Sequence, residues 1–134
     1  MKIEIGYKHT YPFTISQEQV KSFAENSGDT NPLHIDEEFA KTTIFKKRII
    51  PGFLAGSVFS KIFGTIFPGI GTIYLKQDMK FLKPMFPGVN YQSICEVISF
   101  DEQKKRIVVK TSIVDLENNV YIVGEAVLQN SNLE

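Results

Sequence analysis

The chain has 134 residues, which fits one domain over residues 1–134 and leaves no room for a second. Its 15 Lys and Arg balance its 15 Asp and Glu, so no net charge draws it to nucleic acid or to an anionic membrane. The single cysteine, Cys95, excludes an intrachain disulfide and favours a reducing, cytoplasmic compartment. We expect one soluble globular domain.

The N-terminal part of the chain is predicted to form a strand followed by short helices. Residues 2–14 alternate apolar and polar side chains, as a strand does. Ser16 is a suitable N-cap for a helix that stops near Gly28. Asp36 is a second N-cap candidate, for a helix over residues 37–45.

A longer apolar helix is predicted next. It begins after Pro51 and Gly52, runs over residues 53–67 and ends at Pro68-Gly69. The apolar segment is too short to cross a bilayer, which takes about 20 residues. Because its side chains are apolar on almost every face, we expect the helix to be buried on all sides.

The second half of the chain changes to the period of a β-sheet. Strands are predicted over residues 72–81, 89–100, 106–116 and 120–128, and the polar tail over residues 129–134 is expected to fray. Consecutive strands joined by short polar turns pair antiparallel. The pattern therefore predicts an α+β fold in which one antiparallel sheet wraps around one buried helix.

Residues 27–34 carry the candidate chemistry. They read Ser-Gly-Asp-Thr-Asn-Pro-Leu-His and lie between two predicted helices. The Asn31-Pro32 step forces a turn that can bring Asp29 and His34 together. A carboxylate beside an imidazole can deprotonate a water molecule and return a proton elsewhere. By themselves, however, an Asp in a turn and a solvated His are common, so the residues leave catalysis open.

Residues 27–36 closely resemble the hydratase motif of the MaoC-like, (R)-specific enoyl-CoA hydratases. Residues 50–54 resemble that family's entry into its central helix, and residues 68–74 and 81–84 resemble its first long strand and the end of that strand. The resemblance covers about residues 15–128. It implies a single hotdog domain, a homodimer with the substrate near the subunit interface, and a trans-2-enoyl-CoA substrate. It also implies that neither a cofactor nor a metal takes part.

The resemblance also implies residue roles. Asp29 and His34 would hold a water molecule, and one of them, with Asp29 the first choice, would take its proton. The N–H of Gly52, at the positive end of the central helix, would stabilise the enolate oxygen. Asn31 would orient the pair or contact the substrate. Ser60 would face the site, unless its hydroxyl bonds back to its own helix.

Two features leave questions open. Pro51 stands where many relatives have His, which puts the geometry of this loop in doubt. The basic triplet of residues 46–48 would either meet coenzyme A phosphates or form a solvated face.

Several functions compete with hydration. A thioesterase of the same fold would release free thiol, and an acyl-carrier-protein dehydratase would differ in the surface that meets the carrier. A non-catalytic acyl-CoA binding module would bind without turnover. The Asp29–His34 pair, with Asn-Pro between its members, favours hydration.

Overall fold

The computed structural model describes all residues 1–134 and contains four helices and six strands. The helices are α1 (Gln17–Ser27), α2 (Pro32–Ile35), α3 (Glu37–Lys41) and α4 (Gly52–Thr65). The strands are β1 (Lys8–Thr14), β2 (Ile73–Gln77), β3 (Lys80–Phe81), β4 (Asn90–Asp101), β5 (Arg106–Asp115) and β6 (Val120–Gln129).

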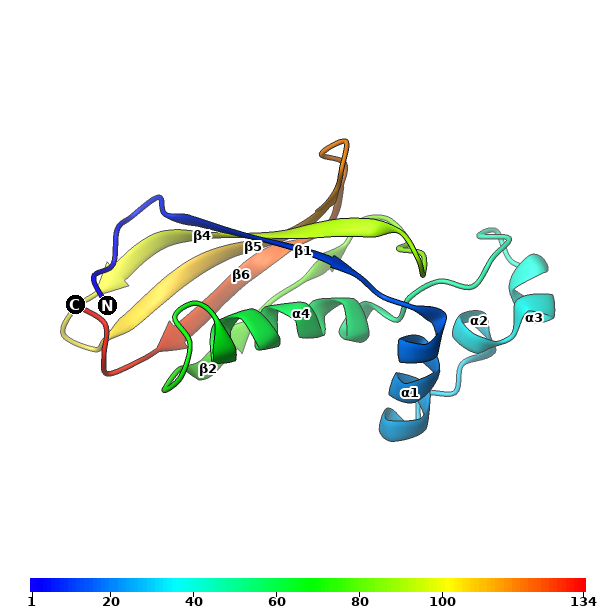
Figure 1. Ribbon diagram of the computed structural model, residues 1–134, viewed down its shortest axis with the longest axis horizontal. Helices are drawn as coiled ribbons and strands as arrows, with labels where there is room; N and C mark the ends of the chain where they lie inside the picture. The colour runs from blue at the N-terminus through cyan, green and yellow to red at the C-terminus, as the bar shows by residue number, and fades with distance from the viewer.

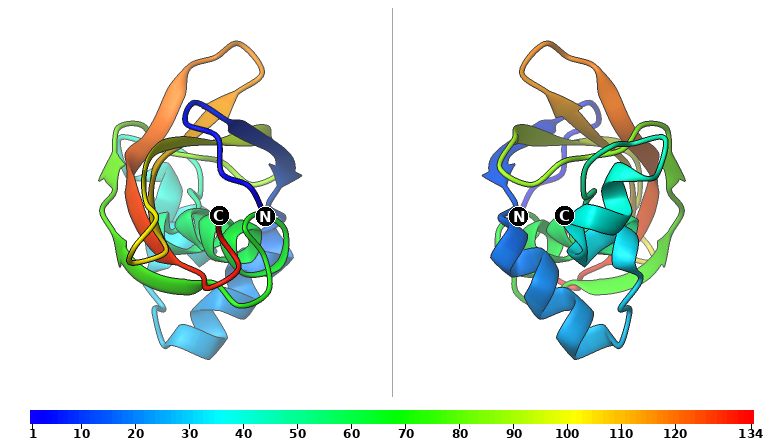
Figure 2. Two further views of the ribbon diagram at one scale, coloured as in Figure 1. Left: turned by 90° about the vertical axis from the view of Figure 1, so that its left-hand side faces the viewer. Right: turned by 90° about the vertical axis from the view of Figure 1, so that its right-hand side faces the viewer.

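The strands form one antiparallel sheet in the order β1-β4-β5-β6-β2, and β3 also pairs with β6. Figure 1 shows α4 lying along the concave face of this sheet, with α1, α2 and α3 gathered at one end and both chain termini at the other. The end-on views show the sheet curling around α4 (Figure 2). The predicted α+β fold, a sheet wrapped around a central helix as in a hotdog fold, is confirmed.

The predicted helix starts are confirmed, because both depend on local hydrogen bonds. Ser16 accepts from the backbone N–H of Gln19, and the Gln19 side chain accepts from the N–H of Ser16, which makes a capping box for α1. Gly28 ends α1 with a φ of 79°, a conformation that suits glycine. Asp36 caps α3 by accepting from the N–H of Phe39.

Helix α3 is shorter than predicted and stops at Lys41. The hydroxyl of Thr42 donates to the carbonyl of Phe39, and that of Thr43 donates to the carbonyl of Ala40. These side chains occupy backbone carbonyls that continuing helical turns would need. The segment over residues 42–51 therefore forms a loop that leads into α4.

The prediction that α4 is buried on all sides is wrong. Ala55, Phe59, Ile62 and Phe63 are at most 1% exposed and form the core with the sheet. Phe53, in contrast, is 73% exposed, so one face of the helix is open to solvent in the single chain.

The predicted strand over residues 72–81 is interrupted at Asp78. The backbone N–H of Asp78 donates to the carbonyl of Glu125, and its carboxylate accepts from the N–H of Glu125. A bulge between Tyr74 and Lys76 shifts the register against β6 in the same region. These features divide the predicted strand into β2 and β3.

The prediction that residues 129–134 fray is also wrong. Leu133 is 1% exposed and belongs to the core. The buried Asn130 side chain donates to the carbonyl of Ile70 and to the hydroxyl of Thr72. The backbone of Glu134 exchanges hydrogen bonds with residues 1–3. Buried apolar area and satisfied backbone groups thus hold the tail against the turn before β2.

Candidate active site

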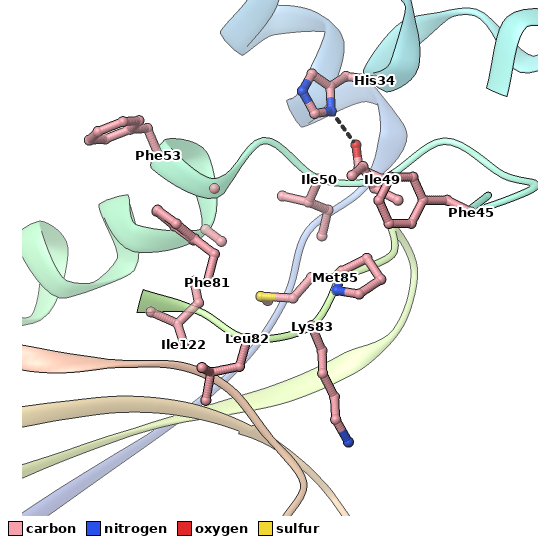
Figure 3. Close-up of a pocket in the computed structure, with 13 residues that line it drawn as sticks. His34, Phe45, Ile49, Ile50, Phe53, Phe81, Leu82, Lys83, Met85 and Ile122 are labelled. Carbon is pink, nitrogen blue, oxygen red and sulfur yellow. Dashed lines mark hydrogen bonds between the residues drawn. The ribbon is translucent and has the colours of Figure 1, made fainter. Parts of the chain in front are cut away.

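His34 is held in one orientation. Its Nδ1 lies 2.8 Å from the carbonyl oxygen of Ile49 (Figure 3). A carbonyl can only accept, so Nδ1 carries the proton of this bond. The ring is 9% exposed. In the neutral ring Nε2 therefore has a free lone pair and is the nitrogen available to exchange a proton.

The local sequence places His34 on a short helix that we did not predict. Asn31 caps α2 by accepting from the N–H of Leu33, and Pro32 occupies the first helical position, where no N–H is needed. The amide of Gln17 donates to the carbonyl of His34 at 2.8 Å. His34 is thus anchored to α1 on one side and to the loop before α4 on the other.

An apolar cavity of about 420 Å³ adjoins His34. The loop before α4, the first turns of α4, the segment over residues 81–85 and strand β6 form its walls. Nine of its 13 lining residues are hydrophobic, which suits an acyl chain better than a polar ligand. Figure 3 shows the cavity at the start of α4, with His34 on α2 at its edge. The residues that line it are His34, Phe45, Ile49, Ile50, Gly52, Phe53, Ala55, Phe81, Leu82, Lys83, Pro84, Met85 and Ile122.

Gly52 lies in the same cavity, at the N-terminus of α4. No protein group accepts a hydrogen bond from its backbone N–H. The first N–H groups of a 14-residue helix are free donors at the positive end of the helix dipole. A Cβ at this position would lie 2.5 Å from Cε1 of Phe81, so any larger residue would require that ring to move.

The structure brings His34 and Gly52 together but leaves Asp29, Asn31 and Ser60 outside the lining of the cavity. Asp29 is exposed, and its carboxylate accepts from the N–H of Asn31 at 3.4 Å. No hydrogen bond joins Asp29 to His34. The side chain of Asn31 serves as the cap of α2.

Ser60 lies on the exposed face of α4 and makes no hydrogen bond to its own helix. Ser57, one turn earlier, does bond back, to the carbonyl of Leu54. The alternative considered for Ser60, a hydroxyl that bonds back to its own helix, is therefore wrong.

Cys95 is excluded as a nucleophile by its surroundings. It is fully buried on β4, and burial raises the pKa of its thiol to about 11. A thiol with this pKa stays protonated near neutral pH and is a poor nucleophile. No group of three or more His, Cys, Asp or Glu side chains is placed to hold a metal ion.

The basic triplet forms part of a separate hollow. Lys46, Lys47 and Arg48 line it together with the acidic Glu37. The Lys47 ammonium lies 4.7 Å from the centre of the Phe86 ring, a contact that holds it at the surface.

Sequence reasoning missed two kinds of site group. The Ile49 carbonyl that orients His34 is a backbone atom, which no side-chain pattern marks. Met85 and Ile122 line the cavity from segments 50 or more residues away from His34. The sequence pattern does not show that these residues lie near His34, because they come together only when the strands pair.

No helix in the structure combines the length and the apolar character needed to cross a membrane.

Known proteins resemble this chain both in sequence and in fold. An (R)-specific enoyl-CoA hydratase from Aeromonas caviae is 36% identical over 127 residues, which cover 95% of each chain. A mitochondrial 3-hydroxyacyl-[acyl-carrier-protein] dehydratase from Arabidopsis thaliana is 35% identical over 89% of this chain and 72% of its own length.

Solved structures give the same result. An (R)-hydratase from A. caviae superposes with a TM-score of 0.91 at 36% identity, covering 96% of this chain and 97% of its own. An R-hydratase from Pseudomonas aeruginosa in the unliganded form superposes with a TM-score of 0.89 at 35% identity, covering 96% and 82%. The MaoC-like domain model matches residues 2–119. The chain therefore belongs to the family of MaoC-like domain proteins.

Proposed function

We propose that this protein is an (R)-specific enoyl-CoA hydratase, a hydro-lyase that adds water to trans-2-enoyl-CoA and gives (R)-3-hydroxyacyl-CoA. The observation that carries the proposal is the shared cavity, in which His34 and the free N–H of Gly52 adjoin an apolar wall. Relatives at 36% identity over nearly the whole chain carry the name of this activity.

In the proposed reaction, Asp29 and His34 hold a water molecule between them. Asp29 takes its proton, and the hydroxide adds to the β-carbon of the enoyl thioester. His34, protonated at Nε2, gives a proton to the α-carbon from the same face. The proton on Asp29 returns to His34 before the next turnover, so the pair is restored. We propose that no metal or cofactor takes part, because both proton transfers use these two side chains.

The hydrogen bond to Ile49 supports this role for His34. Nδ1 carries a proton in the neutral ring and in the imidazolium, so the bond persists through the cycle. The proton is therefore exchanged only at Nε2. The N–H of Gly52 donates to the enolate oxygen that forms between the two proton transfers. Asn31 fixes the turn between the two acid–base residues. Ser60 contacts the substrate from the exposed face of α4.

We also propose that the protein acts as a homodimer in the cytoplasm. The edge strand β2 has no partner on its outer side and exposes Ile73, Tyr74 and Leu75. Unpaired apolar edges of this kind are covered in stable proteins. Phe53 links this surface to the site, because it lines both the cavity and a hollow beside β2. The buried free thiol of Cys95 fits a reducing compartment.

The experiment that tests the activity uses purified protein and crotonyl-CoA. Hydration removes the absorbance of the conjugated enoyl thioester without releasing thiol, and chiral analysis of the product gives the (R) isomer. Release of free thiol would instead identify a thioesterase. Turnover of an enoyl carrier protein but not of enoyl-CoA would identify a carrier-protein dehydratase. Binding without either signal would identify a binding module.

A further inference from the structure

We propose that Gln17 is a positioning residue for His34. Its hydrogen bond holds α2 so that the imidazole keeps its proton on Nδ1 and leaves Nε2 free to exchange one. The inference rests on the proposed hydratase function, and it deepens that function by giving a role to a side chain that does not line the cavity.

Helix α2 depends on other segments for its position. It has four residues, and a helix of this length is not stable alone in water. The N–H of Asp36 closes its single turn by donating to the carbonyl of Pro32. The last carbonyls of a helix lack partners within it. Groups outside α2 therefore have to fix the place and the rotation of His34.

Gln17 supplies one of these groups from a fixed platform. Its side-chain amide donates to the backbone carbonyl of His34 at 2.8 Å, in a partly buried position. Ile15 and Val20, on either side of Gln17 in the sequence, are 5% and 0% exposed and belong to the core. The donor is therefore held by the core, and it transmits that position to the end of α2.

The loop before α4 supplies the other groups. The N–H of Ile49 donates to the carbonyl of Leu33 at 3.4 Å, and the carbonyl of Ile49 accepts from Nδ1 of His34 at 2.8 Å (Figure 3). The second bond depends on the rotation of α2, because a hydrogen bond weakens steeply when its distance or angle changes. Gln17 bonds to the same residue that carries the ring, so it acts on this bond directly.

Loss of the Gln17 bond would change the chemistry of His34 as well as its support. A neutral imidazole carries its proton on one of two nitrogens, and the hydrogen-bond partner of the ring decides which. Without the bond to Ile49 the proton is free to move to Nε2. In that tautomer Nε2 no longer accepts a proton, so a fraction of the protein would be unable to complete the proposed cycle.

The first test compares kcat and KM for hydration of crotonyl-CoA. Gln17→Glu keeps the shape of the side chain, and a carboxylate in the first turn stabilises a helix, but it cannot donate to a carbonyl. Gln17→Leu also lacks a donor. We expect kcat to fall about tenfold or more in both proteins while KM stays within about twofold, because small displacements of a reacting group are costly. Gln17→Lys, which can donate, should recover part of kcat.

Gln19→Leu is the matched control in the same turn of α1. The Gln19 side chain accepts from the N–H of Ser16 and completes the capping box, and no hydrogen bond joins it to α2. Its removal should lower the temperature of thermal unfolding and leave kcat unchanged. The control therefore separates the stability of α1 from the positioning of His34.

The second test observes the ring of His34 without substrate. The chain has two histidines, so His9→Gln leaves His34 as the source of the only imidazole signals. In ¹⁵N NMR spectra at a pH where the ring is neutral, the His9→Gln protein should show Nε2 as the nitrogen without a proton. When Gln17→Glu is added, the spectra should show a mixture of the two tautomers.

A folded Gln17→Glu protein with the original kcat, or with a change confined to KM, would overturn the inference. An unchanged tautomer in that protein would overturn it as well, whatever the rate. A protein that hydrates no enoyl thioester would overturn the proposed function instead, and the NMR comparison would still decide whether Gln17 holds the His34 ring.

Discussion

The side-chain amide of Gln17 donates a hydrogen bond to the backbone carbonyl of His34 at 2.8 Å, which ties the first turn of α1 to the last turn of α2. The side chain of the same residue is also held, because the imidazole Nδ1–H donates to the backbone carbonyl of Ile49. His34 is therefore fixed both through its backbone and through its ring. Such support from neighbouring groups is what a proton-transfer residue needs in order to hold its orientation.

Replacing either acid–base residue is expected to remove turnover and leave the fold intact. Asp29→Asn and His34→Gln each keep nearly the same shape but cannot exchange the required proton. We expect rates to fall by about 10²–10⁴-fold, the usual contribution of general acid–base catalysis, measured as hydration of crotonyl-CoA. His9→Gln and Asp101→Asn are the matched controls, since each makes the same chemical change at a residue outside both the cavity and the motif of residues 27–36. A near-normal rate in a folded Asp29→Asn or His34→Gln protein would contradict the assigned roles.

Adding one methyl group at Gly52 is expected to reduce activity even though its N–H remains. In Gly52→Ala the new Cβ would lie 2.5 Å from Cε1 of the Phe81 ring, so the ring has to move from its place in the cavity wall. We expect kcat/KM to fall by about tenfold, and the second change Phe81→Leu to recover part of the loss, because the two residues are in contact. The four proteins of this double-mutant cycle are compared in one assay. A Gly52→Ala protein with the original rate would show that activity does not depend on the close contact between residue 52 and the Phe81 ring.

A charge on the free edge strand is expected to separate the proposed dimer. Ile73→Lys places a cation on an edge that a second β2 would pair with, and edge lysines oppose such pairing. Light scattering coupled to size-exclusion chromatography should show the mass of one chain, with activity falling alongside. Leu116→Lys is the matched control: it also charges an exposed apolar residue, 64% exposed, but one in the turn between β5 and β6. A dimeric Ile73→Lys protein would place the interface elsewhere.

Acid is expected to weaken the turn between β5 and β6. The Asp115 carboxylate accepts hydrogen bonds from the side chain and backbone of Asn119, from the N–H of Glu117 and from the Tyr121 hydroxyl, and these bonds lower its pKa from 3.8 to about 2. A carboxyl with a lowered pKa stabilises the fold above its unfolded pKa, and that contribution is lost as the pH falls toward 2.

The measurement is thermal unfolding of the original protein and of Asp115→Asn across this range. The variant should unfold at a lower temperature at neutral pH, and the difference should shrink between pH 4 and pH 2. A difference that stays constant with pH would show that the carboxylate charge does not support the turn.

The parts of the fold that could be predicted are those set by local chemistry. Ser16 and Asp36 cap helices because a side-chain oxygen three residues before an N–H satisfies it, whatever the rest of the chain does. The strands over the second half followed from alternation and polar turns. The candidate pair, Asp29 and His34, was found from its motif, and the structure does not test the role of either residue.

The remaining features depend on contacts between distant segments. Asp78 interrupts a predicted strand because it bonds to Glu125, and Leu133 is buried because the ends of the sheet and helix leave room for it. The lining of the cavity comes from the loop before α4, α4 itself, residues 81–85 and β6, which meet only after the sheet has closed on α4. The exposed face of α4 was not predicted, although apart from Phe53 its exposed residues are polar or small: Ser57, Ser60, Lys61, Gly64 and Thr65.

The contacts of Asn130 tie the end of the chain to the start of the edge strand β2. Its amide holds the carbonyl of Ile70 and the hydroxyl of Thr72, in the turn from which β2 starts. The last residues therefore act as a brace that fixes where the free edge of the sheet begins. Loosening these contacts is expected to leave α2, which carries His34 and lies at the opposite end of the molecule in Figure 1, unchanged, while it disorders the start of the edge that pairs in the proposed dimer. In the proposed dimer, a substitution in this tail therefore acts on association through the edge strand, without touching the strand itself.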